Sequence, residues 1–431
     1  MFSIKKLQYT FKNDIYKNVF ILFSGSSIAH IIPLLATILL TRLFTKEQFG
    51  VFFIYSSLCM VFSMFISLKL ELAIVLPSKR NDGKILFFSS LLISAVLSIA
   101  AFIILFLLYE PITKILGDKN IGGFLYFLPI SLLFLGAIQS CSYWFNRNNE
   151  YKNISLTKII KSTTSSILQI GFGFLSFLKY GLILGLISGQ LASATYSLYL
   201  SFKGKINKTK DFTFEKMFKL INKYKTIPIF NTSIAVSNTL SNHLPIFLLT
   251  SFYSLEMTAF YGLANRIIAT PMGLISQSVG QVLYNEASKK YNSGQNLLNL
   301  VSSTYKKLIK LAVIPFVILL LIAPWVFSFL FGIEWKLAGT FTQMLIPWLF
   351  LMFLNSPMSY IITILNKQKQ LLVYDILLLI CRFLSLYVGY RIYNSVTYSI
   401  LLFSLTGVIF NLFLIFYILK ISNTKIKLET N

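Results

Sequence analysis

The sequence of 431 residues is poor in charge, since Lys, Arg, Asp and Glu together make up 12% of it. Soluble domains usually carry about 25%, so this chain has too few charged groups to cover the surface of a soluble fold. Apolar residues make up 56%, and the mean hydropathy is +0.72. That content fills about twelve segments of roughly 20 residues, the length that crosses a bilayer. The composition excludes a soluble enzyme, a disulfide-rich scaffold and a disordered tail protein, and predicts a polytopic membrane protein.

Acidic residues and cysteines are scarcer still. There are 14 Asp and Glu against 39 Lys and Arg, so the formal net charge is +25. The three cysteines, Cys59, Cys141 and Cys381, lie in apolar stretches without a CxxC pair, which argues against disulfides and metal binding. The sequence also lacks the nucleotide-binding pattern GxxxxGKS/T, HExxH and GxSxG. We therefore expect no enzymatic activity, no cofactor, no metal site and no nucleic-acid partner.

Twelve apolar segments are each long enough to cross about 30 Å of hydrocarbon at 1.5 Å per helical residue. They cover residues 19–42, 49–76, 85–109, 121–145, 154–178, 180–202, 226–251, 257–286, 308–332, 339–365, 370–391 and 394–420. We predict an all-α integral membrane protein with twelve transmembrane helices in two six-helix lobes.

Basic residues alternate between the two sides of these segments. The termini and every second loop, including residues 146–161, hold 29 Lys and Arg, the opposite loops hold 7, and three lie inside segments. Because cytoplasmic loops are enriched in Lys and Arg, both termini are predicted to be cytoplasmic. Residues 2–17 mix apolar and basic side chains, which fits either a helix in the headgroup layer or a solvated tail.

The longest hydrophilic stretch divides the chain in half and contains a possible amphipathic helix beginning at Thr213. The predicted parts are a basic N-terminal segment, an N-lobe, a basic linker, a C-lobe and a cytoplasmic tail, at residues 1–18, 19–202, 203–225, 226–420 and 421–431. The two halves resemble each other: Pro33 precedes a Ser/Thr-x-Glu cap at Thr45, and Pro245 precedes one at Ser254. This similarity predicts two parallel repeats about an axis along the membrane normal.

Several segments resemble the polysaccharide-biosynthesis family of lipid-linked oligosaccharide flippases, also called Wzx-type O-antigen or capsule-unit flippases. They are GSSIAHIIPLLATILLTRLFTKEQFGVF (25–52), LELAIVLP (70–77), FYGLANRIIATPMGLISQSVGQVLYNEAS (260–288), FGIEWKLAG (331–339) and NSPMSYIITILNKQKQ (355–370). The FG-x-E-W-x-x-AG pattern is the most specific of them, and the resemblance extends from about residue 18 to 395.

This resemblance implies a fold like that of MATE transporters, in the multidrug/oligosaccharidyl-lipid/polysaccharide exporter (MOP) superfamily. It implies a central cavity open alternately to each face, in the bacterial inner membrane. The implied activity moves an undecaprenyl-diphosphate-linked oligosaccharide to the periplasmic leaflet for O-antigen, lipopolysaccharide or capsule synthesis. Implied partners are that lipid-linked glycan, membrane lipids, and a polymerase and chain-length regulator of the same pathway. Coupling to a proton or sodium gradient stays open.

Ionisable groups deep in a membrane are costly and therefore indicate function. Arg266, Arg382 and His30 fall near the middle of their predicted spans, where guanidinium groups could hold a diphosphate in a shared cavity. The alternative for each arginine is a structural bond to helix carbonyls or to Asp375. Gln277 and Gln281 share a helix face with Arg266 and fit either a sugar-facing stripe or an interhelical contact.

Four further residues are candidates for the cavity mouth, gating or coupling. Lys69 either snorkels to the headgroups or lies near the inner mouth, and the family resemblance favours the mouth. Glu71 is a candidate gate. Because Glu71 and Lys69 are two residues apart, their side chains would not face each other on a regular helix. His243, like His30, precedes a proline, which suits either proton coupling or an interhelical hydrogen bond. Asp375 completes this set.

Two other functions compete with the flippase. A polysaccharide polymerase or ligase would need a large extracytoplasmic loop with catalytic residues, and the predicted outer loops are short. A MATE-type drug or cation exporter would need mid-membrane carboxylates, whereas the deep charges here are mostly positive. The charge pattern therefore favours an anionic substrate.

Overall fold

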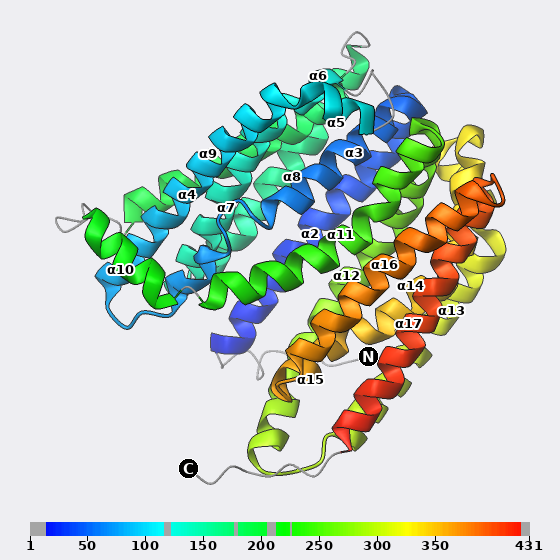
Figure 1. Cartoon of the computed structure of the whole chain (residues 1–431). Coiled ribbons are helices and arrows are strands. Elements are labelled where there is room, and N and C mark those ends of the chain that lie inside the picture. Colours follow the sequence, from blue (N-terminus) through cyan, green and yellow to red (C-terminus); the bar gives the residue numbers. More distant parts are fainter. Residues whose placement is uncertain (1–13, 116–121, 176–179, 205–212, 225, 424–431) are drawn as a thin grey trace, which may run out of the picture. The chain divides into compact units, whose positions relative to one another are not determined.

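The computed structural model describes residues 14–115, 122–175, 180–204, 213–224 and 226–423, which form helices and no strands (Figure 1). The chain divides into two compact units, Met1–Thr239 and Leu240–Asn431. Most of the predicted N-terminal segment and C-terminal tail, and part of the 203–225 linker, lie outside the described residues.

The first unit contains one helix for each apolar segment of the first half of the chain, with short connecting helices. Its helices are α2 (Asp14–Leu43), α3 (Lys46–Ser63), the 3₁₀ helix η1 (Leu70–Val75), α4 (Arg80–Leu107), α5 (Tyr109–Ile115), α6 (Gly122–Leu125), α7 (Leu128–Arg147), α8 (Tyr151–Phe174), α9 (Gly181–Gly204) and α10 (Phe214–Tyr224). The next helix, α11 (Thr226–Phe252), crosses the boundary between the units.

The second unit continues this pattern. Its helices are α12 (Leu255–Asn292), α13 (Leu298–Phe331), η3 (Ile333–Trp335), α14 (Lys336–Asn355), η4 (Ser356–Met358), α15 (Ser359–Ile364), α16 (Gln368–Arg391) and α17 (Val396–Ser422). Within the described residues of the chain, twelve helices reach 18 residues or more, and each overlaps one of the twelve predicted segments.

Eight of these helices are long and apolar enough to cross a membrane, which identifies a multi-pass membrane protein. The other four long helices, α3, α8, α11 and α12, do not meet that standard of apolarity in the described part of the chain. Their crossing of the bilayer, the total of twelve spans and the cytoplasmic termini stay predictions.

The two units pack their long helices in the same order, counting from α2 in the first and from α11 in the second. In each unit the third helix packs on the fourth, the fourth on the sixth, the fifth on the sixth and the second on the fourth. The caps also correspond: Thr45 accepts from the Gln48 backbone N–H, and Ser254 accepts from that of Met257. The packing order and caps agree with the predicted repeat.

The second predicted span is interrupted, which the apolar run 49–76 does not indicate. Helix α3 ends at Ser63, and the chain turns before η1 begins at Leu70. Leu68 and Lys69 have φ of 50° and 57°, in the left-handed region that non-glycine residues rarely occupy. Two such residues in succession persist only where the surrounding structure holds them.

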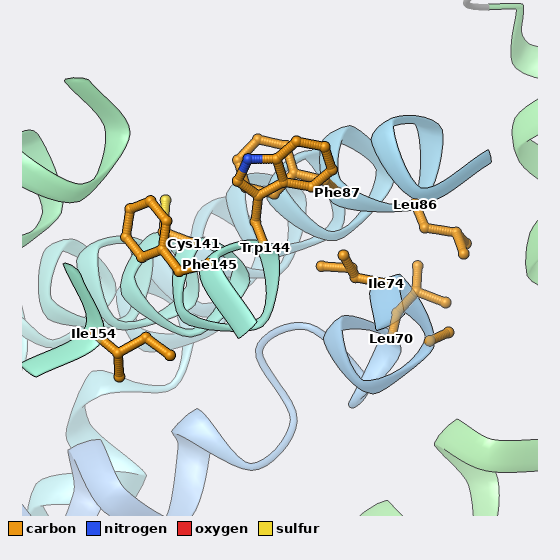
Figure 2. Close-up of a cluster of buried hydrophobic side chains, with 9 residues drawn as sticks. Leu70, Ile74, Leu86, Phe87, Cys141, Trp144, Phe145 and Ile154 are labelled. Carbon is orange, nitrogen blue, oxygen red and sulfur yellow. The ribbon is translucent and has the colours of Figure 1, made fainter. Parts of the chain in front are cut away.

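A buried apolar cluster holds this interrupted segment in place (Figure 2). Leu70 and Ile74 of η1 pack with Leu86 of α4 and with Trp144 of α7. The Trp144 ring lies 5.6 Å from that of Phe87, centroid to centroid. Close van der Waals packing of these side chains offsets the strain of the two left-handed residues.

Candidate functional site

The predicted site residues fall into the two units, and each unit is described separately. In the first unit, α2 and α8 approach closely because small residues face each other. A Cβ on Gly25 would lie 2.3 Å from Ser155 Cβ, and Ser155 Oγ donates a 2.8 Å hydrogen bond to the Ile21 carbonyl. A residue larger than glycine would force the helices apart.

One turn beyond this approach, basic side chains of α8 reach α2. Lys158 Nζ donates to Ser26 Oγ at 2.9 Å. His30 of α2 is close enough to Lys158 and Lys161 to interact electrostatically with both. The histidine and Lys158 are exposed, and Lys161 is partly buried. We call Lys158 and Lys161, with His30 beside them, the first-unit cationic cluster.

The sequence-based charge count assigned the two lysines to the loop 146–161, although they also fall inside the predicted segment 154–178, and the structure places both on a helix. Helix α8 begins at Tyr151, so Lys158 and Lys161 lie about 10 and 15 Å along its axis. The segment has low hydropathy because it is rich in Ser and Thr. Those small side chains are buried in the packed helix, as at Ser155, Thr157 and Ser165. The signal that could have revealed the cluster is the pair of lysines three apart within a helical Ser/Thr pattern.

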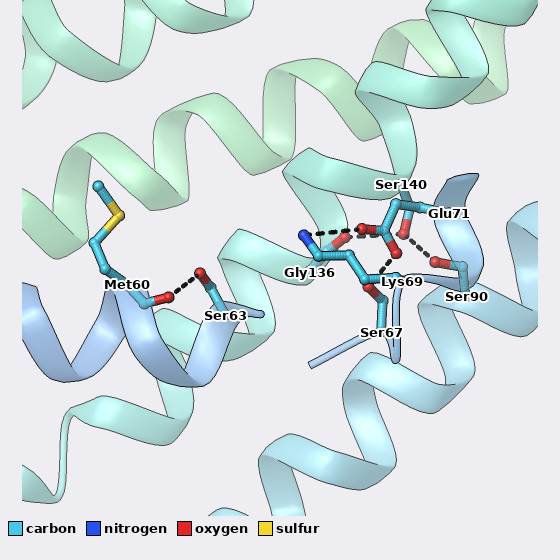
Figure 3. A network of polar contacts seen from close by, with 8 residues as sticks. All are labelled: Met60, Ser63, Ser67, Lys69, Glu71, Ser90, Gly136 and Ser140. Carbon is cyan, nitrogen blue, oxygen red and sulfur yellow. Dashed lines mark hydrogen bonds and ion pairs between the residues drawn. The ribbon is translucent and has the colours of Figure 1, made fainter. Parts of the chain in front are cut away.

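Lys69 and Glu71 form an ion pair, against the expectation that residues two apart do not face each other (Figure 3). Lys69 Nζ lies 3.8 Å from Glu71 Oε1, because the left-handed turn at Lys69 redirects its side chain. Ser67 Oγ donates to the second carboxylate oxygen of Glu71. Glu71 is 1% exposed, so the lysine and the serine stabilise a carboxylate that is otherwise shielded from solvent.

Arg147 fixes the other end of this segment. Its guanidinium donates to the carbonyls of Ile74 at 2.7 Å and Pro77 at 2.6 Å, and to that of Lys79 at 3.2 Å. Gly83 leaves room for it, since a Cβ there would lie 2.7 Å from the guanidinium carbon. Arg147 therefore satisfies carbonyls that η1 leaves without helical partners, and the Lys69–Glu71 pair lies in a segment anchored at both ends.

We expect Glu71→Gln to lower the free energy of unfolding by on the order of 1–3 kcal/mol, because it leaves Lys69 without its carboxylate partner. The double variant Lys69→Met/Glu71→Gln is expected to recover part of that loss. The cycle compares the wild type, Glu71→Gln, Lys69→Met and the double variant. Their free energies of unfolding, obtained from thermal melts in detergent, give the coupling energy. Strictly additive effects would show that the pair contributes no coupling.

In the second unit, Arg382 is enclosed rather than open. It is 2% exposed, and its guanidinium carbon lies 4.7 Å from the Trp348 ring centre and 4.9 Å from that of Phe403. Its Nη1 donates to Ser241 Oγ at 2.9 Å and to Asn242 Oδ1 at 3.2 Å. These contacts join α16 to α11, α14 and α17, and they favour the structural alternative for Arg382 over direct substrate binding.

The remaining second-unit candidates differ in exposure. Asp375 is buried on α16, about two helical turns before Arg382. It is close enough to Arg382 to interact with it electrostatically. His243 is partly buried and follows Asn242, the arginine's partner. The structure thus brings Asp375, Arg382 and the helix turn of His243 into one region.

Helix α12 carries the other three candidates. Arg266 lies about 16 Å along it and is partly exposed, and its carbonyl accepts a 2.7 Å hydrogen bond from Thr270 Oγ1. Further along the helix, Gln277 is exposed and Gln281 is partly exposed. Of the two predicted deep arginines, Arg266 is therefore the one whose side chain is accessible.

A search for groups of three or more His, Cys, Asp or Glu that could hold a metal ion finds none within the described residues. The chemistry available at the accessible positions is therefore cationic and hydrogen-bonding. Ammonium and guanidinium groups suit an anionic ligand.

A protein-family model described as "Polysaccharide biosynthesis protein" matches residues 39–339, which is 301 of 431 residues. The chain belongs to this family. The match covers most of the stretch that carried the sequence resemblance and confirms it. No curated protein sequence matches this polysaccharide biosynthesis family member significantly.

Solved structures resemble the polysaccharide biosynthesis protein in fold. The lipid II flippase MurJ, in an inward closed conformation, has a TM-score of 0.74 and 18% identity over 93% of this chain and 90% of its own. A multidrug resistance MATE family transporter of the MOP superfamily, inward-facing, has a TM-score of 0.60 and 13% identity over 93% and 94%. A MOP superfamily transporter from Pyrococcus furiosus has a TM-score of 0.65 and 13% identity over 94% of both chains. The fold is therefore of the MurJ and MATE type.

Proposed function

We propose that this protein is a flippase for undecaprenyl-diphosphate-linked oligosaccharide units. It moves them from the cytoplasmic to the periplasmic leaflet of the bacterial inner membrane for O-antigen or capsular polysaccharide synthesis, by alternating access of a cationic cavity. Support comes from the family match and from the fold shared with a lipid II flippase.

The observation that carries the proposal is the first-unit cationic cluster. Its two ammonium groups lie 10–15 Å along α8, and Lys158 is held by a serine hydroxyl rather than a carboxylate. Glu71, the buried acid of this unit, already binds Lys69 and Ser67. The cluster therefore keeps positive charge for a ligand, and a diphosphate supplies the matching negative charge.

Arg266 is the candidate cation of the second unit, since its side chain is partly exposed on α12. A guanidinium forms paired hydrogen bonds with phosphate oxygens, whereas ammonium groups act as point charges. Exposed Gln277 and partly exposed Gln281 offer amide groups for sugar hydroxyls. In this proposal, the lysines of the first unit and the arginine of the second are each candidates for binding the diphosphate, and the amides of α12 are candidates for contacting the glycan.

The proposal is tested by locating the lipid-linked glycan in a deletion strain. Its accumulation on the cytoplasmic leaflet, with loss of surface glycan, is the expected result. Accumulation of single units on the periplasmic leaflet would instead indicate a polymerase or ligase. Unchanged glycan with increased drug sensitivity would indicate a drug exporter. Complementation with the intact gene is the control.

The drug-exporter alternative is less well supported by the charges at membrane depth. Both buried carboxylates among the predicted residues lie beside basic groups: Glu71 bonds Lys69, and Asp375 interacts with Arg382. Exchange of a cationic drug for a proton needs a carboxylate that is open to the drug. The accessible charges described above, Lys158 and Arg266, have the opposite sign.

A further inference from the structure

An apolar groove lies between α16 and α17, which run side by side in the second unit (Figure 1). Its volume is about 540 Å³, within the range of small-molecule sites. The walls are formed by Val373, Tyr374 and Leu377 of α16 and by Ile409 and Phe413 of α17. The side chains of Val373, Leu377, Ile409 and Phe413 are exposed, so no residue that the structure describes fills the groove.

The groove occupies one end of the two helices. Its α16 wall runs from Gln370 to Leu377, a rise of about 10 Å from near the start of the helix. Its α17 wall runs from Ile409 to Tyr417, close to the end of that helix. A single leaflet of hydrocarbon is about 15 Å thick, so the length of the groove matches most of one leaflet.

Lysines lie near this end of the two helices in the sequence. Lys367 and Lys369 precede Gln370 at the start of α16, and Lys369 is exposed. On α17, exposed Lys420 lies three residues beyond Tyr417, one turn along the same face. The apolar groove thus lies next to the ammonium groups of Lys369 and Lys420, with Lys367 close by in the sequence.

We propose that this groove binds an anionic glycerophospholipid, with one acyl chain in the slot and the phosphate against Lys369 and Lys420. The charge complementarity identifies the ligand, because an uncharged apolar partner would gain nothing from the lysines. The topology predicted from the loop charges puts this end at the cytoplasmic leaflet. The site is distinct from the first-unit cationic cluster and does not depend on the identity of the transported glycan.

Native mass spectrometry of the full-length protein tests the site, with phosphatidylglycerol and phosphatidylethanolamine of identical acyl chains as probes. We expect the wild-type protein to retain phosphatidylglycerol in preference. Each basic residue near a lipid headgroup contributes about fivefold in affinity. Lys369→Gln/Lys420→Gln is therefore expected to lower phosphatidylglycerol retention about 25-fold, and Leu377→Trp to lower retention of either lipid by filling the slot.

Two matched variants on α13 serve as controls. Lys306→Gln/Lys310→Gln removes two exposed lysines elsewhere, and Ile314→Trp adds the same bulk at another exposed apolar position. Both are expected to leave retention unchanged. Equal retention of the two phospholipids by the wild type, or equal losses in test and control variants, would overturn the proposal. Displacement of phosphatidylglycerol by an equimolar amount of undecaprenyl phosphate would also overturn it. So would a dimer of the protein that Leu377→Trp dissociates, because the groove would then be a protein–protein interface.

Discussion

Replacing both Lys158 and Lys161 with glutamine is expected to abolish surface glycan and to trap the lipid-linked unit on the cytoplasmic leaflet. A hydrogen bond to a charged group contributes about 1.5–3 kcal/mol, so each lysine lost should weaken diphosphate binding tenfold or more. Glutamine keeps similar length and polarity but removes the charge. The measurement is the leaflet distribution of the lipid-linked glycan in a strain that carries only the variant.

Helix α8 supplies its own control for this experiment. Lys152 is exposed in the first turn of the helix, about 9 Å before Lys158. Lys152→Gln should therefore leave transport unchanged, and Lys161→Arg should keep most of it because the charge is kept. Normal surface glycan in the Lys158→Gln/Lys161→Gln strain, at normal protein levels, would refute the role of the first-unit cationic cluster.

The positions of the long helices could be predicted because a membrane span needs a continuous apolar stretch, and those stretches are visible in the sequence. The same signal fails at Met64–Lys69. Hydropathy records how apolar a segment is but not whether its backbone stays helical. The turn that pairs Lys69 with Glu71 depends on packing of η1 against α4 and α7, which sequence periodicity does not report.

The two lysines of the first-unit cationic cluster were missed for the opposite reason. The start of α8 reads as a polar loop, yet Ser and Thr side chains can bond to carbonyls of their own helix. Thr157 Oγ1 donates in this way to the Asn153 carbonyl at 2.7 Å. A helix whose polar side chains bond to its own carbonyls can pack against other helices despite low hydropathy. Lys158 and Lys161 lie on this helix.

The sequence identifies Arg266 and Arg382 equally well as deep arginines, but it cannot separate their environments. Which way a side chain points depends on the rotation of its helix against its neighbours, and an apolar helix with no clear amphipathic pattern does not encode that rotation visibly. The structure encloses Arg382 and leaves Arg266 partly exposed. Substrate binding therefore stays the predicted role of Arg266. For Arg382 we expect a structural role, so its substitution should affect stability rather than transport.

Arg382→Met is expected to destabilise the protein strongly rather than to impair transport in a folded protein. The substitution removes the cation–π contacts with Trp348 and Phe403, at roughly 0.5–2 kcal/mol each. It also removes the hydrogen bonds to Ser241 and Asn242, and leaves their oxygens without the arginine donor. The measurements are the amount of protein in the membrane and the melting temperature in detergent.

Arg391 provides the matched control, because it is exposed in the last turn of the same helix and Arg391→Met should change neither quantity. Arg382→Lys separates charge from shape: an ammonium keeps the charge but cannot reproduce the planar guanidinium stacked on Trp348, so only partial recovery is expected. An Arg382→Met protein with wild-type stability and no transport would reverse this assignment. The guanidinium would then act on the substrate, and its enclosure would describe only one state of the transport cycle.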